Sequence, residues 1–185
     1  ILELARKYEI PVVYAGSSSF WGGVYKNPYT FSKWQGEELC KMYEQIYGLN
    51  VTICRFYNVY GDFMPTEGEY RTVIPIFLEQ YRAGDSLTIT GDGEQRRDFT
   101  HIDDIVEGLI LTSESETSHK TIELGRGQNH SINELAEMFG CGFTYIPERP
   151  GEAKITLCDT SEAFVKIGYK PKVNIEDYVK EIINE

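Results

Sequence analysis

Short apolar runs of strand length alternate with helix-length amphipathic segments along the chain, and this alternation limits the possible folds most strongly. Residues 12–15 and 51–56 form two such runs, and a long helical pattern extends between them from Pro28 to about Tyr47. Strands joined by helices form parallel sheets, because a crossover helix returns the chain to the same end of the sheet. The sequence therefore predicts an α/β fold with a largely parallel sheet.

The elements expected downstream are shorter and less regular. We expect helices at 72–82, 102–112, 131–139, 161–167 and 175–183, strands at 87–90, 121–124 and 143–146, and a polar loop at 113–120. Ser131 and Glu134 have the spacing of a capping box. The change in regularity predicts two lobes: residues 1–60 in the sheet domain and residues 61–185 mainly in a second lobe, with about 95–125 returning to the first.

Composition and charge exclude several classes of function. The net charge of −11 argues against a nucleic-acid partner, which requires clustered Lys and Arg. No segment approaches the roughly 18 apolar residues of a membrane span, and no signal-peptide pattern opens the chain, so we expect a cytoplasmic protein without a membrane partner. The four cysteines and three histidines lack metal-ligand spacing, which predicts reduced, mostly buried thiols and no metal site.

Tyr29 and Lys33 are four residues apart at the start of the long predicted helix. This spacing puts a phenol and an ammonium group on one helix face. The positive charge stabilises phenolate over phenol, so such a tyrosine can remove or return a proton on a hydroxyl group near neutral pH. Alone, the pair is weak evidence in a chain with 13 tyrosines, because the same spacing also arises by chance.

The segment before this helix strengthens the interpretation. Residues 16–22 read GSSSFWG and follow directly after the first predicted strand. An open α/β sheet builds its sites at the carboxyl ends of its strands. We therefore expect a hydroxyl group of this serine run to lie near Tyr29 and Lys33.

Four ordered motifs over nearly the whole chain carry a resemblance to a known family. They are the serine turn with Tyr29-x-x-x-Lys33, RFYNVYG at 55–61, GDGEQRRDFTHIDD at 91–104, and RPGE at 149–152 with GYKP at 168–171. Together they resemble the extended short-chain dehydrogenase/reductases, in particular NAD-dependent nucleotide-sugar epimerases and dehydratases of the UDP-glucose 4-epimerase type. The resemblance implies the C-terminal part of a Rossmann-like sheet plus a small α/β substrate-binding lobe, without the N-terminal dinucleotide-binding half.

The resemblance also implies a role for each matching residue. Ser17, Tyr29 and Lys33 would be catalytic, with Tyr29 as the acid/base and Lys33 on the nicotinamide ribose. NAD would contact Tyr29, Lys33 and Phe56. The substrate-binding residues would be Ser18, Ser19, Asn58, Arg97, Arg149 and Thr156.

Within that substrate set, Asn58 would direct its amide at the diphosphate. Guanidinium groups of Arg97 and Arg149 would flank the same group, since bidentate charge-assisted bonds suit phosphate oxygens. Thr156 would lie beside the sugar ring, where a small side chain would admit an N-acetyl group. Arg96 is expected to face the solvent.

The reaction type follows from what is missing after Ser17. The resemblance implies that dehydratases and decarboxylases of the family have a carboxylate directly after the catalytic hydroxyl residue. This chain has Ser18 and Ser19 there. The groups that remain are one acid/base, Tyr29, and one hydride carrier, NAD. They favour epimerisation at C4 through a transient keto sugar, with NAD regenerated. A dehydratase and a simple dehydrogenase or reductase stay open, because the stretch between Ser17 and Tyr29 is shorter than in most sugar 4-epimerases.

The Gly-rich phosphate turn of dinucleotide-binding domains is absent, and residues 125–127 (GRG) are interpreted as a tight turn before Ser131. We therefore expect an upstream part to be missing, leaving residues 12–15 with an unpaired strand edge. An inert or regulatory fragment is the non-enzyme alternative. The helix at 29–47 is expected to form a homodimer, by analogy with relatives.

Overall fold

The central feature of the fold is a three-stranded parallel sheet, seen in a computed structural model that describes residues 1–68, 71–115, 120–148 and 151–184. Its strands are β1 (Val12–Ser17), β2 (Val51–Phe56) and β7 (Thr121–Leu124), in the order β1-β2-β7. The register aligns Ser17 with Phe56 and Phe56 with Leu124, so the three strands end together at one edge. The predicted α/β fold with parallel strands is confirmed.

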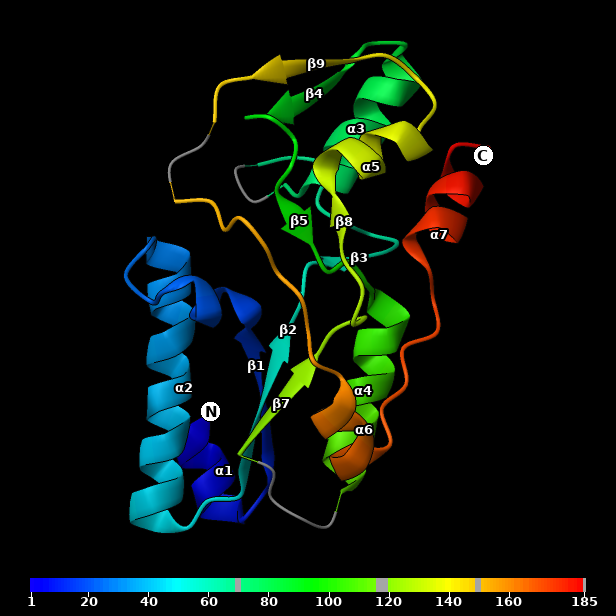
Figure 1. Cartoon of the computed structure of the whole chain (residues 1–185). Helices are drawn as coiled ribbons and strands as arrows, with labels where there is room; N and C mark the ends of the chain where they lie inside the picture. Colours follow the sequence, from blue (N-terminus) through cyan, green and yellow to red (C-terminus); the bar gives the residue numbers. More distant parts are fainter. Residues whose placement is uncertain (69–70, 116–119, 149–150, 185) are drawn as a thin grey trace.

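Helices cover both faces of this sheet. They are α1 (Leu2–Tyr8) and α2 (Pro28–Tyr47) on one face, and α4 (Ile102–Glu114) and α6 (Ser161–Ile167) on the other (Figure 1). Because β2 is central, its alternate residues serve both layers: Ile53 packs in the cluster with α1 and α2, and Cys54 in the cluster with α4 and α6. This explains why β2 is buried along nearly its whole length rather than at alternate residues.

β1 lies at the edge of the sheet. Among the described residues only β2 pairs with it, and Ala15 is exposed. The expected unpaired edge at 12–15 is therefore present in the described part of the chain. Directly after β1, the chain forms a short 3-10 helix, η1 (Ser18–Gly22), and then turns toward α2.

The upper part of Figure 1 is built from short strand pairs around a second apolar core. Its elements are β3 (Val59–Tyr60) with β6 (Thr100–His101), β4 (Leu87–Thr90) with β9 (Phe143–Ile146), β5 (Arg96–Arg97) with β8 (His130–Ser131), and the helices α3 (Val73–Ala83), α5 (Ile132–Met138) and α7 (Ile175–Ile182). Fully buried Phe77, Leu135 and Val179, one from each helix, share one cluster. This cluster holds the strand pairs together.

Several predicted boundaries were wrong by a few residues. The helix predicted to end at 112 continues to Glu114, so two exposed residues assigned to the polar loop are helical. The first strand extends to Ser17, α3 begins at Val73 and ends at Ala83, and α5 and α7 end one residue early. The capping box of Ser131 and Glu134 is confirmed, with both reciprocal bonds present.

Candidate active site

The serine turn begins where β1 ends. Ser17 is nearly buried, and its Oγ accepts a hydrogen bond from the backbone N–H of Ser19 at 3.2 Å and lies 2.9 Å from the Oγ of Ser19. The side chain of Ser17 thus caps the short helix η1. The turn holds three neighbouring hydroxyl-bearing residues at the carboxyl edge of the sheet, as the sequence predicted.

Helix α2 carries the tyrosine and the lysine to the same edge. Asn27 caps the helix and Pro28 starts it, which places Tyr29 in the first turn. The Nζ of Lys33 donates a 3.1 Å hydrogen bond to the carbonyl of Ala15, two residues before Ser17, and lies 6.0 Å from the centroid of the Tyr29 ring. The two α2 residues are therefore gathered beside the end of β1.

Tyr29 is open to the solvent, with 47% of its surface exposed. Its hydroxyl makes no hydrogen bond to any residue in the described part of the chain. Phe56, the third residue expected to contact a cofactor, ends β2 opposite Ser17 and packs its ring against the cluster beneath α4. A flank built from Tyr29 and Lys33 is thus accessible to a cofactor.

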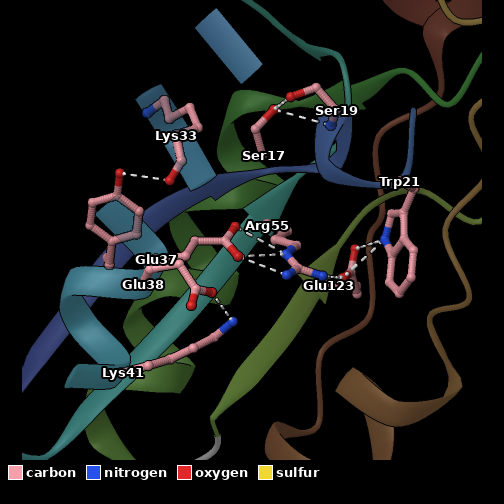
Figure 2. A network of polar contacts seen from close by, with 10 residues as sticks. Ser17, Ser19, Trp21, Lys33, Glu37, Glu38, Lys41, Arg55 and Glu123 are labelled. Atoms are coloured by element: carbon pink, nitrogen blue, oxygen red, sulfur yellow. Dashed lines mark hydrogen bonds and ion pairs between the residues drawn. The ribbon is translucent and has the colours of Figure 1, made fainter. Parts of the chain in front are cut away.

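A buried ion network fixes α2 against the sheet, one helical turn beyond Lys33. Arg55 of β2 donates to Glu37 of α2 from Nε at 3.0 Å and from Nη2 at 2.7 Å, and both side chains are nearly inaccessible (Figure 2). Although burial opposes its charge, the bonds to Glu37 hold the pKa of Arg55 above its ordinary value. A side chain at Gly16 would place Cβ 2.9 Å from the Glu37 carboxylate, so the network also requires that glycine.

The same arginine reaches a second carboxylate across the sheet. Nη1 of Arg55 donates to Glu123 of β7 at 3.2 Å, and the indole N–H of Trp21 donates to Glu123 at 3.2 Å (Figure 2). The ring of Phe20 packs 3.6 Å from the guanidinium carbon. Sequence reasoning missed this network. Its only signal was a charged residue inside an apolar strand, together with Glu37 four residues after Lys33.

A cavity of about 770 Å³ opens beside the serine turn. Its lining includes Ser18, Ser19, Trp21, Tyr57, Glu123 and Thr156. Three of these were predicted as substrate-binding residues from distant parts of the sequence, and the structure brings them together. Burial, followed by the charge of Glu123, raises the pKa of Tyr57 above its usual value.

Asn58 and Thr156 are bonded to each other rather than directed independently at the cavity. Oγ1 of Thr156 accepts from Nδ2 of Asn58 at 2.8 Å and from the backbone N–H of Asp98 at 3.0 Å, and Nδ2 also donates to the carbonyl of Asp98 at 3.1 Å. The amide hydrogens of Asn58 are therefore engaged inside the protein. Its contact with a diphosphate stays a prediction that requires this amide to rearrange.

Arg97 is mostly buried, with 11% of its side chain exposed. Its Nη1 donates to the carbonyl of Arg96 at 3.0 Å, its Nη2 lies 3.6 Å from Glu152, and burial lowers its pKa. Arg96 is the more exposed of the two, as predicted, with 33% of its side chain accessible, and it binds Glu134 and Asn129. Arg149 lies outside the described residues.

Asp98 is a buried anchor that sequence reasoning missed. Its carboxylate accepts from the backbone N–H groups of Arg126, Gly127 and Cys158 at 2.8, 3.0 and 2.9 Å, and from the Thr100 hydroxyl at 3.2 Å. Burial raises the pKa of Asp98, and these hydrogen bonds oppose that shift. Two backbone amides of the turn at 125–127, those of Arg126 and Gly127, are therefore bonded to Asp98. This agrees with the interpretation of the segment as a tight turn rather than a phosphate loop.

The cysteines match the sequence prediction. Cys40, Cys54 and Cys158 are buried and unbridged, and burial raises the pKa of Cys54 to about 11. In the described part of the chain, no group of three or more His, Cys, Asp or Glu residues could hold a metal ion. No helix there is long and apolar enough to cross a membrane.

Comparisons with known proteins agree with this geometry. A curated relative, a putative UDP-glucose 4-epimerase from Methanocaldococcus jannaschii, is 31% identical over 100% of this chain and 66% of its own length. The crystal structure of UDP-glucose 4-epimerase from Thermotoga maritima with UDP-glucose matches with a TM-score of 0.88 and 26% identity, over 99% of this chain and 65% of the other.

A second solved structure is UDP-glucuronic acid 4-epimerase from Bacillus cereus with UDP-glucuronic acid and NAD. It matches with a TM-score of 0.87 and 26% identity, over 99% of this chain and 63% of the other. The chain thus spans about two thirds or less of the length of these proteins. The model of the NAD dependent epimerase/dehydratase family matches residues 1–125. On this evidence the chain belongs to the NAD dependent epimerase/dehydratase family.

Proposed function

We propose that this chain carries the acid/base and sugar-binding residues of an NAD-dependent nucleotide-sugar epimerase acting at C4. The observation that carries the proposal is the placement of Tyr29 and Lys33 beside the end of β1, where the serine turn opens onto the cavity. The putative UDP-glucose 4-epimerase and the two solved 4-epimerases support the same reaction.

Each catalytic residue has a defined task in this proposal. The phenolate of Tyr29 removes the proton from the reacting sugar hydroxyl and returns it at the end of the cycle. The ammonium of Lys33, held on the Ala15 carbonyl, places a positive charge 6.0 Å from the centroid of the Tyr29 ring. Ser17 donates or accepts a hydrogen bond at the same sugar oxygen. The chemistry that NAD would supply when bound, beside Tyr29 and Lys33, is reversible hydride transfer at the sugar carbon.

The exposed flank of Tyr29 and Lys33 fits a nicotinamide ribose, because both side chains are accessible and α2 leaves them beside the open edge of β1. Phe56, at the end of β2, would contact the cofactor from the sheet. The grip on the remainder of NAD is proposed to come from the part of the relatives' length that this chain does not span. Catalysis is therefore assigned to the whole protein, and this chain alone is expected to be inactive.

Epimerisation is favoured over dehydration by the environment of the nearest carboxylate. A dehydratase needs an acid near the sugar, and Glu123 is the carboxylate beside the serine turn. That carboxylate already accepts bonds from Arg55 and Trp21, so it is engaged as an acceptor within the protein rather than directed at a substrate. A dehydratase or simple reductase stays the second candidate.

We also propose that residues 1–60, with segments from about 95–125, form the sheet domain, and that residues 61–185 otherwise form mainly the substrate lobe, apart from α6, which packs on the sheet. The position of β7 in the sheet beside β2 supports this division. The exposed side chains of Leu39, Met42 and Ile46 lie on one face of α2 and support the homodimer. Sedimentation of a Met42→Glu variant as a monomer, against a dimeric parent, would test that assembly.

The proposed activity is tested by incubating the longest natural form of the protein with a panel of nucleotide sugars. Epimer formation is scored by NMR with and without added NAD. Interconversion of the C4 epimers, lost in Tyr29→Phe, is the expected result. A product lacking the elements of water, or one oxidised in proportion to NAD, would replace the epimerase by the dehydratase or the dehydrogenase.

A further inference from the structure

Glu123 gathers donors from two different elements at the wall of the cavity. Its side chain is 16% exposed, and it accepts from Arg55 of β2 and from the indole of Trp21 in η1. Trp21 itself is 65% exposed and lines the same cavity. The bond to Glu123 fixes the orientation of an indole ring whose face is open to a ligand.

The charges in this cluster do not cancel. Arg55 directs two of its guanidinium nitrogens, Nε and Nη2, at Glu37, with bonds of 3.0 and 2.7 Å. Glu123 receives the remaining nitrogen, Nη1, at the longer distance of 3.2 Å. One cation thus serves two carboxylates, and the surplus negative charge lies on the residue that faces the cavity. The opposite carboxylate, Glu37, is buried beneath α2.

Two other carboxylates of the cavity wall have cations of their own, because Glu152 lies 3.6 Å from Arg97 and Glu162 pairs with Lys166. Glu123, in contrast, shares its one guanidinium partner with Glu37. A sugar carboxylate placed beside Glu123 is repelled by the charge of Glu123, because the low dielectric of a partly dehydrated site weakens screening. Neutral hydroxyl groups, in contrast, can donate hydrogen bonds to such a carboxylate.

From this geometry we infer that Glu123 and Trp21 form a sugar subsite that takes an uncharged hexose and excludes a sugar bearing a carboxylate. The inference rests on the proposed function and narrows its substrate class. The family alone does not decide this point, since the matched structures include one epimerase with UDP-glucose and one with UDP-glucuronic acid. Glu123 acts here as a specificity-determining residue, by charge repulsion and by holding the indole in place.

The test is calorimetric titration of the chain with UDP, UDP-glucose and UDP-glucuronic acid, without NAD. The parent chain is expected to bind UDP-glucose about tenfold more tightly than UDP-glucuronic acid. Glu123→Gln keeps the shape but removes the charge, and should reduce that ratio to about threefold or less, while affinity for UDP alone changes less than about twofold. Trp21→Phe keeps the charge of Glu123 and should keep the discrimination.

Glu162→Gln is the matched control, since it removes the same charge from an exposed residue at the cavity rim. An equal loss of discrimination in Glu162→Gln would overturn the inference, because net charge alone would then explain it. Equal or stronger binding of UDP-glucuronic acid by the parent chain would also overturn it, without any variant. If the protein binds UDP but shows no preference between UDP-glucose and UDP-glucuronic acid, the inference is wrong and the proposed function is unaffected. If it binds none of the three ligands, both are wrong.

Discussion

Two parts of the candidate site differ in how far their polar groups are already engaged. On one side, Tyr29 is half exposed and its hydroxyl bonds to no described residue. On the other side, Asn58 and Thr156 are bonded to each other and to Asp98, so that their hydrogen-bonding groups are satisfied within the protein. We call these the open side and the closed side.

This difference indicates which part of the site is complete. The closed side is organised without any ligand, because Asp98 alone accepts four hydrogen bonds from three separate segments. The open side keeps its reactive groups accessible, which is where a cofactor and a reacting hydroxyl must enter. Changes on the open side should therefore affect turnover, and changes on the closed side should affect stability and binding.

The largest effect is expected from Tyr29→Phe on the open side. Removing a positioned acid/base should lower kcat by about 10²–10⁴-fold, with substrate affinity nearly intact. The melting temperature should not change, because the hydroxyl contributes no bond within the described structure. Steady-state kinetics and thermal melting check both points. A large loss of stability would show that the open side is structural.

Glu37→Gln tests how α2, which carries the open side, is fixed to the sheet. It leaves the buried cation of Arg55 without its main partner, so unfolding free energy should fall by about 3–5 kcal/mol. The double replacement of Glu37 and Arg55 by Met should recover most of that loss, since no isolated charge then remains. Denaturant unfolding of the single and double variants measures the difference. Equal stability of parent and Glu37→Gln would contradict the role given to this pair.

On the closed side, Asp98→Asn should be costly for stability and for substrate affinity. An amide nitrogen would face backbone donors, and at least one of four hydrogen bonds would be lost, at about 1–3 kcal/mol. KM should rise while kcat changes little, because the Asp98 carboxylate anchors the backbone at Cys158, two residues from Thr156, whereas none of its hydrogen-bond partners lies on α2 with Tyr29. Asp103→Asn, an exposed change on α4, is the control.

The smallest effect is expected from Glu134→Gln, far from the open side. The bond from Arg96, followed by the bond from the Ser131 amide, lowers the pKa of Glu134. A lowered pKa means that the ionised form stabilises the fold above about pH 4.5, and that this contribution is lost as pH falls through the folded-state value. The variant should lose less than about 1 kcal/mol at neutral pH, since solvent screens the pair, and nothing in acid. Glu137→Gln, exposed on the same helix, is the matched control.

The open side was more predictable from sequence than the closed side, for a physical reason. Tyr29 and Lys33 lie on one helix after a strand, so a local pattern predicts their common face and their position at the sheet edge. The partners of Asp98 come from residues 100, 126, 127 and 158, and nothing local indicates that they converge. The two-residue strands β3, β5, β6 and β8 are similarly too short to have a period.

The pairing of Arg55 with Glu37 illustrates the same limit. Each residue carries a local anomaly, a cation in an apolar strand and a carboxylate on a buried helix face. Only the packing of α2 on β2 shows that the two anomalies resolve each other. The family resemblance supplied Asn58, Arg97 and Thr156 as substrate residues, yet their internal bonds could be read only from the folded chain.

The most direct test of the account is a crystal structure of the whole protein with a nucleotide sugar and NAD. We expect one sugar hydroxyl oxygen within about 2.6–3.2 Å of both Tyr29 Oη and Ser17 Oγ, with the sugar in the cavity beside Trp21. A sugar bound with all of its hydroxyl groups away from Tyr29, or the diphosphate at the position of the reacting hydroxyl, would contradict it.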